Sequence, residues 1–120
     1  MDNAKETVIQ SLTLSVKKEE GKTVLHWQGE SDEKNPTQYL VPFFDEFLKS
    51  VDGDLDVIFN NLNYMNSSTI HPLIMFIKSC NDKNIKTTIY YDKTSAWQEA
   101  SFKALHSLTQ ILTNIRVIGT

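Results

Sequence analysis

The side chains best suited to chemistry in this chain lie in one short polar run, residues 66–69, with the sequence Asn-Ser-Ser-Thr. His71 follows the run after a single intervening residue. A serine hydroxyl can accept a phosphate, and it can act as a nucleophile when a base activates it. Asn, Ser and Thr are also preferred capping residues at helix starts. Considered alone, these residues favour a helix cap and leave a modification site open.

Neither a catalytic centre nor a metal site is predicted. Ser67 and His71 lack a visible orienting acid, and the Gly-x-Ser-x-Gly turn that exposes a nucleophilic serine is absent from the sequence. His26, Cys80 and His106 are far apart in the sequence and do not show the spacing of metal ligands. The glycines are scattered, so no phosphate-binding loop is predicted. We expect no enzymatic activity, no metal and no cofactor.

Composition and charge are those of an ordinary globular domain. The 120 residues are 40% hydrophobic and 22% charged, which predicts one domain over residues 1–120. The net charge of −3 argues against a nucleic-acid partner, which needs a basic face. No apolar run is long enough for a membrane span, and the first residues lack the apolar region of a signal peptide. We expect a cytoplasmic protein in which the single cysteine, Cys80, is buried and reduced.

The polar run lies between an expected strand and an expected helix. Apolar residues alternate over residues 55–59, which is typical of a strand, and recur at helical spacing over residues 70–77. A helix that begins at residues 68–69 would place Pro72 near its first turn, where proline is tolerated. Ser67 would then lie on the loop side of the junction. In an open α/β sheet, ligands and partners gather at this end of the strands.

The remaining pattern predicts an α/β fold with about five strands and about three helices. Residues 1–8 are polar and are expected to be loose. The order of elements predicts a mixed sheet with an N-terminal β-hairpin and then β-α repeats, with the helices packed on the sheet. The other expected elements are strands at residues 12–16 and 24–27, the second ending at Gly29, a helix at residues 36–51 kinked at Pro42, a strand at residues 86–91, a helix that begins at Ser95 in a capping box with Gln98, and a strand at residues 115–118.

Together with this order of elements, residues 64–68, Tyr-Met-Asn-Ser-Ser, resemble the STAS domain of sulphate transporters and anti-sigma factor antagonists, a SpoIIAA-like fold. In that family an apolar strand is followed by an aromatic and an apolar residue, then by Asp-Ser-Ser-Gly-Leu and a helix. Asn66 stands in place of the Asp, as in a divergent branch that includes the SiaC-type biofilm-regulating phosphoproteins. Residues 29–31 (Gly-Glu-Ser) and 39–45 (Tyr-Leu-Val-Pro-Phe-Phe-Asp) also look like that branch. Thr69 departs from the family pattern, in which glycine is common at this position.

The resemblance implies a phosphorylation switch in a bacterial signalling protein. In anti-sigma antagonists a serine/threonine kinase phosphorylates the first serine of the motif, a phosphatase reverses the step, and the unphosphorylated form binds a partner. That serine is Ser67 here, with Ser68 as the second choice. The implied target is an anti-sigma factor or a signalling enzyme such as a diguanylate cyclase. The residues expected to contact a partner are Glu30, Ser31, Tyr64, Asn66, Ser67, Ser68, Thr69 and His71.

Charge supplies a mechanism for such a switch. A phosphate adds about −1.5 to −2 charges, and Glu30, Asp32 and Glu33 would make the surroundings acidic if their loop lies beside Ser67. If a partner buries unmodified Ser67, phosphorylation of that serine would place an unpaired dianion in the interface. Burying such a charge is unfavourable, so the partner would be released. The alternative is a constitutive scaffold or a small-ligand-binding module on the same fold, whose binding would not depend on Ser67.

Overall fold

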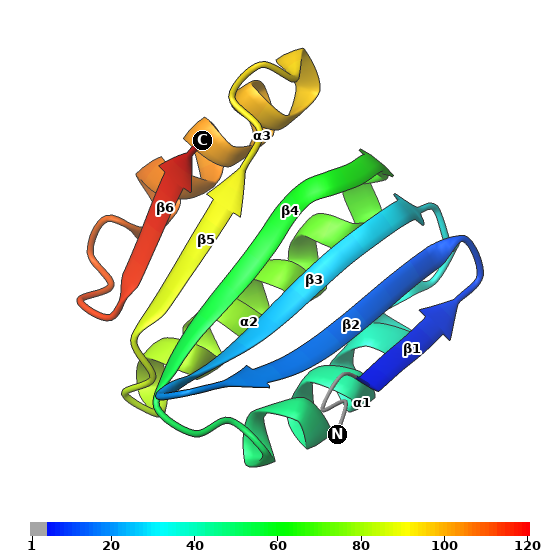
Figure 1. Ribbon diagram of the computed structural model, residues 1–120. Coiled ribbons are helices and arrows are strands. Elements are labelled where there is room, and N and C mark those ends of the chain that lie inside the picture. The colour runs from blue at the N-terminus through cyan, green and yellow to red at the C-terminus, as the bar shows by residue number, and fades with distance from the viewer. Residues whose placement is uncertain (1–4) are drawn as a thin grey trace.

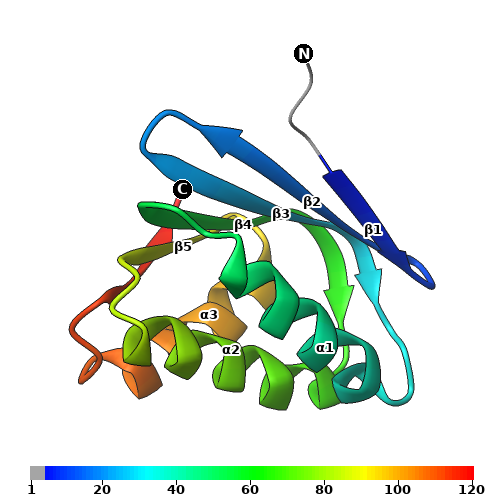
Figure 2. The same ribbon diagram turned by 90° about the horizontal axis from the view of Figure 1, so that it is seen from below.

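Alternating apolar residues build a six-stranded mixed sheet, and three helices pack on one of its faces (Figures 1 and 2). The computed structural model describes residues 5–120. The strands are β1 (Lys5–Ile9), β2 (Leu12–Glu19), β3 (Lys22–Ser31), β4 (Asp54–Met65), β5 (Thr87–Tyr91) and β6 (Ile115–Gly119). The helices are α1 (Pro36–Lys49), α2 (Ile70–Asp82) and α3 (Ala96–Thr109), with a 3₁₀ turn, η1 (Ser67–Thr69), directly before α2.

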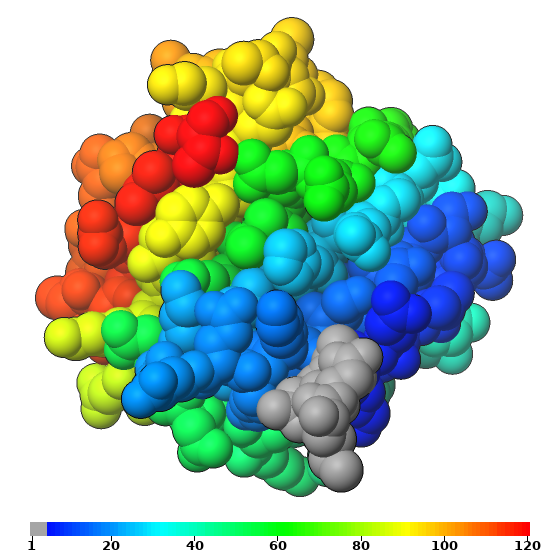
Figure 3. All heavy atoms as spheres, in the orientation of Figure 1, coloured from blue at the N-terminus to red at the C-terminus, as the bar shows by residue number. Residues whose placement is uncertain are grey.

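The order of the strands in the sheet is their order in the chain. β1, β2 and β3 form an antiparallel meander, whereas β3, β4, β5 and β6 run parallel. Each parallel connection passes through a helix, and Figure 2 shows α1, α2 and α3 beneath the sheet. The carboxyl ends of the four parallel strands therefore meet at one edge, at the top of Figure 1. Figure 3 views the face of the sheet that the helices do not cover. The side chains of successive strands follow one another across it from blue to red.

Aromatic rings join the two layers. Trp27 on β3 lies 4.9 Å, between ring centroids, from Phe59 on β4 and 6.0 Å from Phe44 on α1. Phe44 in turn stacks on Phe76 of α2 at 4.3 Å. All four side chains are buried, and full burial of a phenylalanine stabilises a fold by roughly 1.5–3 kcal/mol. This cluster fixes α1 and α2 over the two central strands.

The structure has one strand more than the sequence pattern predicted. The prediction that residues 1–8 are loose is wrong for residues 5–8, which belong to β1, and residues 1–4 lie outside the described residues. β1 pairs with β2 in a register that places Thr7 opposite Leu14. This pairing supplies hydrogen bonds and cross-strand contacts that a short, partly polar segment does not signal by itself.

β3 continues beyond Gly29, where the sequence pattern predicted its end. Gly29 has a φ of +87°, and a Cβ at this position would clash with the carbonyl oxygen of Ser11. The pairing of β3 with β4 shifts register between Gly29 and Glu30. The strand therefore adjusts without ending, and Ser31 comes to lie beside Met65 of β4.

Helix α1 begins at Pro36, as predicted, with Asn35 at the N-cap position. The side chain of Asn35 makes no capping hydrogen bond. The helix runs through Pro42 to Lys49, so the internal proline does not divide it. Within residues 5–120, none of the helices is both long enough and apolar enough to cross a bilayer.

Cys80 lies in the core, as predicted, and is fully buried. Desolvation raises the pKa of its thiol to about 11, although a hydrogen bond with Thr87 acts in the opposite direction. The thiol is therefore protonated at neutral pH and is a poor nucleophile.

The predicted capping box at the start of α3 is wrong. Ser95 stands at the N-cap position without a side-chain hydrogen bond, and Gln98 is buried. The amide nitrogen of Gln98 donates to the carbonyl oxygens of Phe59 (2.7 Å) and Leu62 (2.9 Å). Its amide oxygen accepts from the backbone N–H of Asp92 (2.8 Å). The pairing of β4 with β5 ends at Ile58, before Phe59 and Leu62 are reached. Gln98 therefore takes the place of a strand partner for these two residues.

Gln98→Ala should lower the free energy of unfolding by about 2–4 kcal/mol, because two carbonyl groups and one N–H lose their partner. Urea denaturation followed by circular dichroism measures the difference. Gln38→Ala, on the exposed surface of α1, is the matched control and should change stability by less than about 0.5 kcal/mol. Equal effects of the two substitutions would contradict the bridging role of Gln98.

Candidate functional site

The polar run joins a strand to a helix, as predicted. β4 ends at Met65, Asn66 follows in an extended conformation, and η1 leads directly into α2. Thr69 occupies the N-cap position of α2, so Pro72 is the third residue of the helix. A proline in the first turn costs no helical hydrogen bond, because the N–H groups there have no acceptor within the helix. The predicted late start of the helix is confirmed, and Ser67 lies before it, at the carboxyl edge of the sheet (Figure 1).

Asn66 uses both ends of its amide to tie this junction together. Its oxygen accepts hydrogen bonds from the backbone N–H of Thr69 (3.0 Å) and from the Thr69 hydroxyl (2.7 Å). Its nitrogen donates to the carbonyl oxygen of Glu33 (2.9 Å). Its backbone N–H donates to the carbonyl oxygen of Ser31 (2.9 Å). Asn66 therefore caps η1 and also fastens the loop that follows β3.

Ser31 and Thr69 form the buried floor of the junction. Their hydroxyl oxygens are 2.8 Å apart, and the two residues are 2% and 0% exposed. Because the amide oxygen of Asn66 can only accept, the hydroxyl hydrogen of Thr69 is committed to it. The Thr69 oxygen therefore accepts from the Ser31 hydroxyl. Both side chains support the junction from beneath and do not reach its surface, although the resemblance to STAS domains implied that they contact a partner.

Five of the residues expected to contact a partner are exposed at this edge. Tyr64 keeps 48% of its surface accessible, and Glu30 lies beside it in the register of β3 with β4. Asn66 is partly buried beneath them. We call the five exposed residues the junction surface: Glu30, Tyr64, Ser67, Ser68 and His71.

The loop after β3 lies beside the junction, as the charge argument requires. The hydrogen bonds from Asn66 to Ser31 and Glu33 place this loop next to η1. The side chain of Asp32 is exposed and that of Glu33 is partly exposed. The loop therefore brings the side chains of Asp32, Glu33 and the exposed Lys34 to this side of the junction, while the start of α2 carries the partial positive charge of a helix N-terminus.

The hydrogen-bond network of the junction was missed by the sequence analysis. Ser31 and Thr69 are 38 residues apart, and no spacing rule links them. The available signal was the resemblance of residues 29–31 to a divergent STAS branch, which marked Ser31 without revealing its structural role. Among the side chains of residues 5–120, no three of the His, Cys, Asp or Glu type are grouped as a metal site.

Asn66→Asp should lower the free energy of unfolding by about 1–3 kcal/mol, because a carboxylate cannot donate to the Glu33 carbonyl oxygen. Urea or thermal unfolding at pH 7 measures the loss. Asn63→Asp makes the same change of charge at an exposed position of β4 and should have an effect below about 0.5 kcal/mol. Wild-type stability of the Asn66→Asp protein would show that the amide nitrogen does not hold the loop.

The chain matches no protein-family model and no curated protein sequence. Among solved structures, it is similar to an uncharacterised protein of the DUF3478 family from Shewanella loihica PV-4, which has a SpoIIAA-like fold. The two share 8% sequence identity, the match covers 93% of this chain and 88% of the other, and the TM-score is 0.55. At this identity the likeness shows the fold alone. The STAS-like layout predicted from the sequence is confirmed, and this chain has a SpoIIAA-like fold.

Proposed function

We propose that this protein is a non-catalytic signalling protein that binds a partner through the junction surface and is switched by phosphorylation of Ser67. The observation that carries the proposal is the division of the junction into two layers. Ser31 and Thr69 are buried and hold the backbone, whereas Ser67 and Ser68 are exposed above them. A group added to an exposed hydroxyl leaves the supporting hydrogen bonds intact.

The position of Ser67 suits a phosphate. Ser67 is the first residue of η1, which leads into α2, and the N–H groups at a helix start lack acceptors within the helix. The helix dipole stabilises an anion at such a position by roughly 0.3–1 kcal/mol, and by up to about 2 kcal/mol when it is partly buried. The domain is therefore expected to stay folded when Ser67 is phosphorylated. The switch then acts on binding and leaves the fold unchanged.

Release of the partner follows from charge. A phosphate adds about −1.5 to −2 charges to a surface that already holds Glu30 near the end of β3 and Asp32 and Glu33 in the loop that follows. A partner that covers unmodified Ser67 would have to bury the new charge without a counter-ion, which is unfavourable. Each loss of about 1.4 kcal/mol in binding free energy weakens the complex tenfold.

The proposed partners follow from the resemblance to STAS domains. A serine/threonine kinase and an opposing phosphatase would act on Ser67, and the target would be an anti-sigma factor or a signalling enzyme such as a diguanylate cyclase. The SpoIIAA-like fold is compatible with this role. Asn66, in place of the family's Asp, removes one negative charge from the surface that a kinase would recognise. We therefore expect a kinase whose specificity differs from that of the sigma-factor kinases.

Ser67 should carry a phosphate in the native cell. Site-localising mass spectrometry on the protein isolated from its own cells, with and without phosphatase treatment, measures this directly. We expect a phosphatase-sensitive phosphate on Ser67. A phosphate on Ser68 alone would move the switch by one residue, and the absence of phosphate under every growth condition would contradict the proposal.

Ser67→Asp should weaken binding of the purified target by about tenfold or more, because it adds a charge where the partner is expected to bury a hydroxyl. Ser67→Ala should bind at least as tightly as the unmodified protein. Isothermal titration calorimetry measures both. Ser107→Asp, the same substitution at an exposed position of α3, is the control and should leave the Kd unchanged. Indifference of the target to every Ser67 variant would favour a constitutive scaffold or ligand-binding module.

A further inference from the structure

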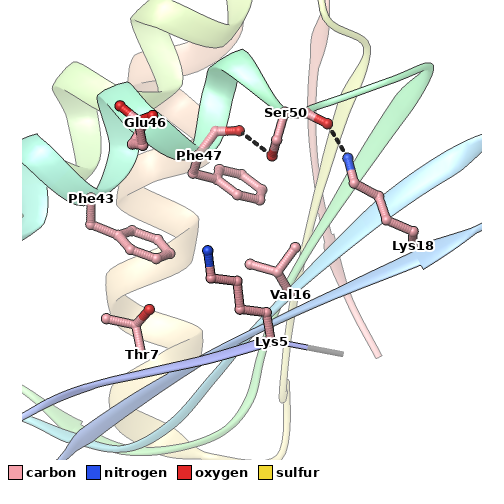
Figure 4. A pocket seen from close by; sticks show the side chains of 8 residues that line it. All are labelled: Lys5, Thr7, Val16, Lys18, Phe43, Glu46, Phe47 and Ser50. Carbon is pink, nitrogen blue, oxygen red and sulfur yellow. Dashed lines mark hydrogen bonds between the residues drawn. The ribbon is translucent and has the colours of Figure 1, made fainter. Parts of the chain in front are cut away.

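We propose that the pocket between α1 and the β1–β2 hairpin binds a small organic anion with a flat apolar body, such as an aromatic carboxylate. Figure 4 shows this cavity, which we call the hairpin pocket. Its volume is about 460 Å³, within the range of roughly 300–1,000 Å³ that small-molecule sites occupy. Its lining comes from β1, β2 and α1 and combines apolar and charged side chains.

The pocket exists because the side chains that the sheet presents to the second half of α1 are no longer large and apolar. β2 presents Leu12 and Leu14 to the helices, and both are buried. The next positions of β2 on the same face are Val16 and Lys18, and Lys5 of β1 lies opposite Val16. A short side chain and two charged ones do not fill the space that large apolar side chains fill elsewhere between the layers. A cavity with an amphipathic lining is the result.

One wall of the hairpin pocket is aromatic. The rings of Phe43 and Phe47 on α1 are 5.8 Å apart between centroids, with 6° between their planes. Phe47 is buried and Phe43 is partly exposed, and both line the cavity. Parallel rings offer a flat apolar ligand an edge or face for offset packing. This wall selects the body of the ligand.

Two lysines line the pocket from the sheet. Figure 4 shows Lys5 extending from β1 toward the aromatic wall, with no hydrogen bond to the other lining residues drawn. The ammonium group of Lys18 donates to the carbonyl oxygen of Ser50 and to the hydroxyl of Thr23 (2.9 Å). These bonds use two of its three N–H groups and hold it in place. The lysines select the charge of the ligand.

The carboxylate in the lining does not cancel this preference. Glu46 borders the pocket from α1 and forms an ion pair with Lys49 (3.4 Å), which is not part of the lining. The lining therefore contains two lysines and one carboxylate, and this carboxylate pairs with Lys49. An anionic group fits on the lysine side of the pocket and an apolar ring fits on the phenylalanine side, whereas a cationic ligand of the same shape would be repelled.

The hairpin pocket is separate from the junction surface. Ser50, at the C-cap of α1, lines the pocket, whereas Asn66 contacts the loop that precedes α1. Ligand binding here does not require phosphorylation of Ser67. Failure of either proposal therefore leaves the other standing.

The full chain, labelled with nitrogen-15, should be titrated by NMR with 4-butylbenzoate, 4-butylbenzyl alcohol and 4-butylbenzylamine, which share a shape and differ in charge. We expect saturable shifts of the backbone amides of Thr7, Val16 and Phe43, with a Kd for the benzoate about tenfold or more below the other two. Equal Kd values for the three probes would overturn the proposal. So would shifts confined to other surfaces, or none with millimolar benzoate.

Lys5→Met should weaken binding of the benzoate by about two- to fivefold, the range of an exposed ion pair, and should leave the Kd of the alcohol unchanged. Lys17→Met removes the same charge from the other face of β2 and should leave both Kd values unchanged. Because Lys5 is exposed on an edge strand, its loss should not unfold the chain, and circular dichroism verifies this. Unchanged benzoate binding by Lys5→Met, or an equal loss with Lys17→Met, would overturn the site. Ser67→Asp should bind the benzoate like the wild type.

Discussion

The geometry of the candidate site depends on one amide group, that of Asn66. An amide accepts at one end and donates at the other, whereas an ionised carboxylate can only accept. The oxygen of Asn66 holds the turn before α2, and its nitrogen holds Glu33, which lies 33 residues earlier in the chain. An asparagine at this position therefore does more than an aspartate could. It allows the loop after β3 to be tied to the start of α2.

Burial divides the polar run by role. A 3₁₀ turn advances by about 120° per residue, so three consecutive side chains point in three directions. In η1, Ser67 and Ser68 point outward, while Thr69 points inward to the hydroxyl of Ser31. Hydroxyl side chains thus support the junction at position 69 and are exposed to solvent at positions 67 and 68. The proposed switch relies on this division, because a modified surface hydroxyl leaves the supporting bonds in place.

The sheet extends beyond the strands that the aromatic cluster covers, β3 and β4, to the β1–β2 hairpin. α1 packs against α2 over the central strands, and on its other side it overhangs the β1–β2 hairpin (Figure 2). At that margin, Lys5 and Lys18 replace the leucines that fill the space closer to the centre. The hairpin pocket and the junction thus lie near opposite ends of α1. A phosphorylation switch and a ligand site can coexist on one SpoIIAA-like fold without sharing residues.

The sequence by itself determined the order of the central elements, because the alternation over residues 55–59 and the helical spacing over residues 70–77 are local patterns. Pro72 restricted the start of α2 because a proline lacks the N–H group that the helix interior needs, and this placed Ser67 before the helix. The tertiary structure decided β1, the extension of β3, the bridging role of Gln98 and the burial of Ser31 and Thr69. β1 depends on its pairing with the neighbouring strand β2, and the other three depend on hydrogen-bond partners from distant parts of the chain. A local pattern reports a residue's own preferences and carries no information about which distant group will satisfy them.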